Sequence, residues 1–86
     1  MKVKSTLVLR EVLNTWMVIP VATEEQSEYL LKLNESGAKL WKLLENDADI
    51  DVLANALVNE YGISFDNAKQ DAQEFVNLLI QKGCLE

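Results

Sequence analysis

The change in apolar spacing near Asn34 restricts the fold more than any other feature of the sequence. Before it, short runs of β-branched and apolar residues predict three strands, at 6–12, 16–21 and 28–33. After it, apolar residues recur with the period of a helix, which predicts three helices. This order predicts an α+β fold: an N-terminal three-stranded antiparallel sheet followed by a three-helix bundle that resembles a winged helix.

The strand region contains its own stop signals. The Leu13-Asn14-Thr15 connection is short enough to make the first two strands a hairpin. Pro20 cannot donate to a sheet ladder, so it should mark the end of its strand or a bulge. In the third strand, alternation puts two sets of residues on opposite faces: Tyr29, Leu31 and Leu33 on one, Leu30 and Lys32 on the other.

Each predicted helix begins at a residue that suits an N-cap: Asn34, Asp49 and Ser64. Gly62 and Gly83 follow the second and third helices, where glycine commonly ends a helix. The second helix has the most regular pattern, with apolar residues at Ile50, Leu53, Ala54, Leu57, Val58 and Tyr61. We therefore expect Leu57 to be a core residue.

Composition excludes several classes of protein. The chain has 86 residues, enough for a single domain spanning 1–86. It contains no histidine and one cysteine, Cys84, which excludes disulfide scaffolds, Cys/His zinc sites and His-dependent catalysis. Three glycines cannot form a phosphate-binding loop. We accordingly predict a protein that is not an enzyme and that needs neither cofactor nor metal.

Charge and hydropathy bear on location and partners. No signal peptide or membrane-spanning run is present, so we expect a cytoplasmic protein with no membrane partner. The net charge of −6 opposes nucleic-acid binding, which depends on cations that neutralise phosphates. An acyl or peptidyl carrier protein needs a serine at a helix start, usually within Asp-Ser-Leu, and the surroundings of Ser36 and Ser64 do not match.

The third strand and third helix point instead to peptide binding. An exposed edge strand pairs with extended peptides through main-chain hydrogen bonds. The third helix has two apolar flanks, Asp71/Phe75/Leu78 and Lys69/Val76/Ile80. One flank should pack on the sheet and the other line a groove; we predict that the Asp71 flank lines the groove.

One segment closely resembles a family signature: Leu31-Lys32-Leu33-Asn34-Glu35-Ser36-Gly37-Ala38-Lys39-Leu40-Trp41-Lys42-Leu43-Leu44. It is similar to the Leu-Asn-Glu-Thr-Gly-Ala-x-x-Trp-x-Leu-Leu signature of PqqD-like proteins, which are named for coenzyme PQQ synthesis protein D and are also called RiPP recognition elements. Ser36 replaces the commoner threonine, a difference of one methyl group. The resemblance extends from Leu9-Arg10-Glu11-Val12 to Gly83-Cys84-Leu85 and so covers almost the whole chain.

The resemblance implies a non-catalytic module that binds the leader of a ribosomally synthesised precursor peptide and presents it to a modifying enzyme, often a radical SAM protein. In that family the leader adds as a strand to the third strand and packs against the third helix. The corresponding peptide-binding residues here are Glu28, Tyr29, Leu30, Leu31, Lys32, Asp71, Phe75 and Leu78.

Two alternatives stay open. The trihelical region also suits a winged-helix domain that regulates transcription or binds another protein. The edge of the third strand could also pair with its own copy and form a homodimer.

Overall fold

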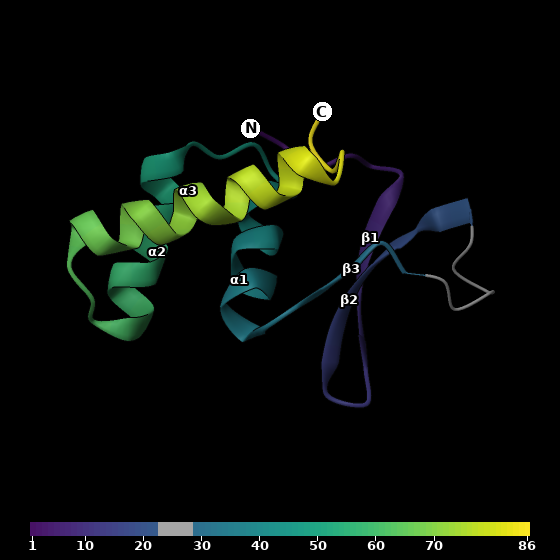
Figure 1. Ribbon diagram of the computed structural model, residues 1–86, viewed down its shortest axis with the longest axis horizontal. Helices are drawn as coiled ribbons and strands as arrows, with labels where there is room; N and C mark the ends of the chain where they lie inside the picture. The colour runs from purple at the N-terminus through teal and green to yellow at the C-terminus, as the bar shows by residue number, and fades with distance from the viewer. Residues whose placement is uncertain (23–28) are drawn as a thin grey trace.

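The computed structural model describes residues 1–22 and 29–86 and contains three strands followed by three helices (Figure 1). This confirms the predicted α+β fold. The elements are β1 (Leu7–Val12), β2 (Thr15–Pro20), β3 (Leu31–Leu33), α1 (Glu35–Leu44), α2 (Ile50–Tyr61) and α3 (Phe65–Gln81).

The strands form one antiparallel sheet in the order β1-β2-β3. The β1–β2 turn is one residue shorter than predicted, because Thr15 pairs with Val12 and belongs to β2. Leu13 and Asn14 fill the turn with φ angles of 51° and 65°. A two-residue hairpin turn needs such left-handed backbone to match the strand twist, which asparagine tolerates better than leucine. Pro20 is the last residue of β2, as predicted.

β3 begins at Leu31, three residues later than predicted, and Glu28 lies outside the described residues. Leu31 and Leu33 are buried and Lys32 is exposed, in agreement with the predicted alternation. Tyr29 does not continue the buried face, since half of it is exposed. A β-bulge explains the break: Leu30 donates to the carbonyl of Val18, which also lies opposite Leu31.

The helices begin and end where their capping residues predict. The side chains of Asn34, Asp49 and Ser64 each accept a hydrogen bond from the backbone N–H three residues later. Gly62 and Gly83 adopt left-handed backbone just after α2 and near the end of α3, with φ angles of 68° and 70°.

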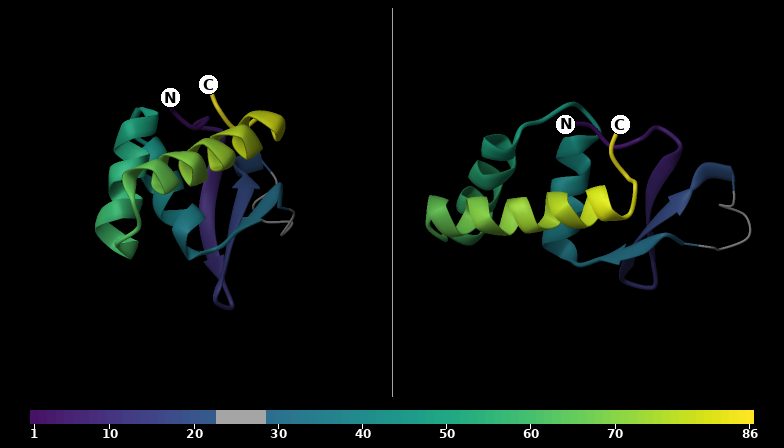
Figure 2. Two further views of the ribbon diagram at one scale, coloured as in Figure 1. Left: turned by 60° about the vertical axis from the view of Figure 1, so that its left-hand side comes forward. Right: turned by 45° about the horizontal axis from the view of Figure 1, so that its top comes forward.

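The core lies among the three helices and continues onto one face of the sheet. Figures 1 and 2 show α3 lying across α1 and α2, with the sheet at one end of the helical layer. The largest fully buried side chains are Trp41, Leu44, Leu53, Leu79, Val18 and Cys84. The two ends of the chain lie side by side, because Val3 pairs with Leu85. None of the described helices is both long and apolar enough to cross a membrane.

Candidate functional site: an open strand edge beside an apolar hollow

The outer edge of β3 presents unpaired main-chain groups. The carbonyl of Val18 points toward β3, because it accepts from Leu30 at 2.7 Å. Opposed residues in an antiparallel ladder alternate between bonded and non-bonded pairs, so Leu31 and Leu33 bond to β2. Lys32, which lies between them, therefore turns its N–H and C=O away from β2. Within residues 1–22 and 29–86, no further strand lies beside this edge.

The strand residues predicted to bind the peptide differ in the direction of their N–H groups. Leu30 and Leu31 direct their N–H groups into the sheet, and Lys32 directs its own outward. The Lys32 ammonium lies 5.2 Å from the centre of the Tyr29 ring, and Leu30 is 37% exposed. The side chains available at this edge are thus a cation, an aromatic ring and an aliphatic group.

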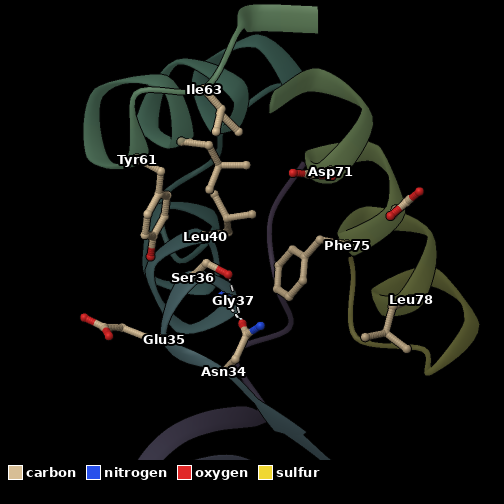
Figure 3. Close-up of a pocket in the computed structure, with 12 residues that line it drawn as sticks. Asn34, Glu35, Ser36, Gly37, Leu40, Tyr61, Ile63, Asp71, Phe75 and Leu78 are labelled. Atoms are coloured by element: carbon tan, nitrogen blue, oxygen red, sulfur yellow. Dashed lines mark hydrogen bonds between the residues drawn. The ribbon is translucent and has the colours of Figure 1, made fainter. Parts of the chain in front are cut away.

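A hollow of about 720 Å³ lies between the start of α1, the end of α2 and one side of α3 (Figure 3). Asp71, Phe75 and Leu78 line it together, so the structure brings the three predicted α3 residues to one surface. On the opposite flank of α3, Val76 is buried and Ile80 is 60% exposed. The four described strand residues of the predicted set, Tyr29 to Lys32, do not line the hollow.

Gly37 joins the end of β3 to the hollow. Its N–H donates to the Asn34 side chain at 2.8 Å, which fixes the first turn of α1. A Cβ atom at Gly37 would lie 3.3 Å from Cε1 of Phe75 and 3.4 Å from Cβ of Leu33. The absence of a side chain therefore lets the Phe75 ring lie close to the first turn of α1, as the close-up shows (Figure 3).

The hollow is apolar at its base. Leu40 from α1, Leu57 from α2 and Ile63 from the loop that follows α2 contribute to its lining. Leu57 is 5% exposed, so it belongs to the core as predicted and also contributes to this surface. Burial of an aliphatic or aromatic guest side chain here would be favourable by about 25 cal/mol for each Å² of apolar surface removed from water.

One ion pair connects α1 to α2 near the mouth of the hollow. Lys39 donates to the carboxylate of Glu60, and this hydrogen bond raises the pKa of Lys39 above its ordinary value. The Lys39 ammonium also lies 5.7 Å from the centre of the Tyr61 ring, and Tyr61 lines the hollow. The contact holds Tyr61 near α1, although its exposure to solvent limits its energy.

Sequence reasoning missed part of the site. The predicted peptide-binding set omits Asn34, Gly37, Ile63 and Glu74, which also line the hollow. A glycine in the first turn of a helix is a usable signal, because it often permits close approach by another element. The outward direction of Lys32 had no signal in the sequence, because it depends on the register of β3 against β2.

The arrangement is suited to holding an extended chain. Across the described residues, no three His, Cys, Asp or Glu side chains gather closely enough to hold a metal ion. An open strand edge beside an apolar hollow can hold an extended chain, with main-chain hydrogen bonds supplying affinity and the hollow supplying selectivity. Asp71 is exposed, so its carboxylate forms a charged wall at the surface of the hollow, above the apolar base.

Comparisons with known proteins bear on the fold and the family of this chain. No curated protein matches the chain. Two solved structures share its fold, the first described as "TbiB1 in Complex with the TbiA(beta) Leader Peptide", with 22% identity and a TM-score of 0.78 over 100% of this chain and 95% of that one. The second, "Lasso peptide synthetase B1 complexed with the leader peptide", has 18% identity and a TM-score of 0.75 over 96% and 93% of the two chains. The family profile for "Coenzyme PQQ synthesis protein D (PqqD)" matches residues 21–85, and this chain therefore belongs to the PqqD family.

Proposed function

We propose that this protein binds the leader segment of a ribosomally synthesised precursor peptide and presents the peptide to a separate modifying enzyme. The observation that carries the proposal is the outward main chain of Lys32 next to the hollow lined by Phe75. The two solved structures compared above are described as complexes with leader peptides. The leader would add as a strand along β3 and place an apolar side chain in the hollow.

The module needs no reactive group of its own for this role. Holding one end of a flexible substrate raises its effective concentration at an associated enzyme. We propose a radical SAM protein as that enzyme and the cytoplasm as the location. Ordering a flexible leader opposes binding, so the affinity should come from a few apolar contacts and an aligned main chain.

Lys32→Pro tests strand addition directly, because it removes the outward N–H and leaves the donors of Leu31 and Leu33 in place. Proline is tolerated at an edge strand where the N–H faces solvent, so the sheet should survive. We expect affinity for peptides selected by display on the immobilised protein to fall about tenfold, measured by calorimetry. Lys32→Ala is the matched control, since it removes the side chain and keeps the N–H.

Hydrogen exchange provides a second measurement on the unmodified protein. The Lys32 amide should exchange rapidly in the free protein and slowly in the complex, whereas those of Leu31 and Leu33 should be protected in both. If peptides bind while the Lys32 amide stays rapid, strand addition at β3 is wrong. If no peptide is selected at all, the proposed function itself fails.

The alternatives give different results in simple assays. Self-pairing through β3 would make a dimer, but a three-residue strand with one outward residue offers little area for it, and sedimentation at increasing concentration measures the outcome. For DNA binding, Lys69 of α3 is already 3.3 Å from Asp51, which reduces the charge available to phosphates. A gel shift on random DNA at low salt would reveal such binding.

A further inference from the structure

The hollow combines an apolar base with a wall of one charge. Three carboxylate residues line it, Glu35 from α1 and Asp71 and Glu74 from α3, and its lining contains no lysine or arginine. The lysines nearest to the start of α1, Lys32 and Lys39, do not line it. The surface around the apolar base is therefore negative, as is the chain as a whole, with a net charge of −6.

Two of these carboxylates are not neutralised within the described part of the chain. Glu35 lies 3.9 Å from Lys39, although Lys39 bonds mainly to Glu60. No ion pair or side-chain hydrogen bond is formed by Asp71 or Glu74 among residues 1–22 and 29–86. The hollow thus leaves two negative charges available to whatever occupies it.

The placement of Asp71 and Glu74 is unfavourable for the isolated protein. Residues three apart on a helix are surface neighbours, and like charges there destabilise the helix slightly. Both residues are exposed and project from the side of α3 that carries Phe75 and Leu78. A cation bound between them would relieve the repulsion, and a guest that carries an acid at this point would increase it.

We propose that the occupant of the hollow is an extended peptide that inserts one apolar side chain against Phe75 and carries lysine or arginine beside it. This inference rests on the proposed function and adds the class of leader: a basic one. The apolar side chain supplies most of the affinity. The flanking cation supplies selectivity and faster association, both of which weaken as salt increases.

Peptides selected from a random display library on the immobilised protein provide the first test. Selected sequences should contain an apolar residue with lysine or arginine enriched next to it, relative to the unselected library. Enrichment of aspartate or glutamate at those positions, or no charge preference, would overturn the inference while leaving peptide binding intact. Recovery of no binding sequence would overturn both the inference and the proposed function.

The second test removes the charges with little change of shape. Asp71→Asn with Glu74→Gln should weaken a selected peptide about threefold to tenfold at low salt, and the difference should shrink at high salt. Glu45→Gln with Glu86→Gln is the matched control, since it removes the same total charge from exposed residues that do not line the hollow. Equal losses in the two double variants would show that only net charge matters and would contradict the proposed contact.

Folding is not in question for the test variant, because removing two neighbouring like charges from α3 relieves repulsion. Circular dichroism and the unfolding midpoint should therefore match or exceed those of the wild type. A peptide in which the enriched lysine or arginine is replaced by glutamine should bind both proteins equally. A loss in Asp71→Asn/Glu74→Gln that persists with this peptide would refute a direct interaction with the guest cation.

Discussion

Gly37→Ala tests whether the close approach of Phe75 to α1 shapes the hollow. Alanine is favoured over glycine within a helix by up to about 1 kcal/mol. The new Cβ, however, would lie 3.2 Å from Oδ1 of Asn34 and 3.3 Å from Cε1 of Phe75. Overpacking of this kind costs about 1–3 kcal/mol, so we expect a net loss of about 1 kcal/mol in the free energy of unfolding.

A double-mutant cycle assigns the cost to the Phe75 ring. Phe75→Leu removes the ring atom that meets the new Cβ, so Gly37→Ala should become neutral or stabilising in that background. The expected coupling is about 1 kcal/mol, measured by urea unfolding of the four proteins. Gly37→Ala should also weaken peptide binding, because Phe75 lines the hollow and any shift of its ring changes the surface that the peptide meets.

Gly62→Ala is the control for the backbone contribution. Nothing lies within 4 Å of a Cβ at Gly62, but its φ of 68° is strained for alanine. The loss of unfolding free energy caused by Gly62→Ala should be the same whether position 75 carries phenylalanine or leucine. If the effect of Gly37→Ala is also independent of position 75, within about 0.5 kcal/mol, then the proposed contact does not control the packing of α1 against α3.

Two further predictions concern the core. Burial raises the pKa of the Cys84 thiol above its ordinary value of 9.0, so the folded protein holds this proton more tightly than the unfolded chain. The contribution of Cys84 to the free energy of unfolding should therefore be constant below pH 9.0 and should fall as the pH rises from 9.0 toward the folded-state pKa. Cys84→Ala should flatten that part of the pH profile, which unfolding measurements at a series of pH values would show. Leu53→Ala should lower the free energy of unfolding by about 2–5 kcal/mol, as replacement of a fully buried leucine by alanine usually does. A loss below about 1 kcal/mol would show that neighbouring side chains move in and fill the cavity. It should not change peptide affinity in the folded fraction, since Leu53 is fully buried and does not line the hollow.

The helices could be predicted nearly to the residue, and the edge strand could not. The helix starts depend on local chemistry, and the side chains of Asn34, Asp49 and Ser64 each accept the expected backbone N–H. The shape of β3 depends on its register against β2, which no residue in 28–33 encodes by itself. The bulge at Leu30 opposite Val18 reversed the predicted position of Tyr29 for that reason.

The site shows the same division. Periodicity alone placed Asp71, Phe75 and Leu78 on one flank of α3, and the structure puts all three around one hollow. The choice between the two flanks depended on which side of α3 faces α1. Gly37 leaves room for the Phe75 ring on the side of α3 that faces α1, since a Cβ at position 37 would lie 3.3 Å from Cε1 of Phe75. Contacts between residues so far apart in sequence require the assembled fold.

The joint between β3 and α1 consists of Asn34 alone, and its side chain is already used to cap the helix. With so short a connection, a peptide aligned on Lys32 meets the first turn of α1 at a fixed step along its own chain. A one-residue offset would turn its apolar side chain to the opposite face, whereas a two-residue offset would restore the face but miss the hollow. Recognition would thus depend on the spacing between the peptide segment that pairs with Lys32 and the apolar side chain that enters the hollow. Peptides whose residues between these two points differ widely could still bind.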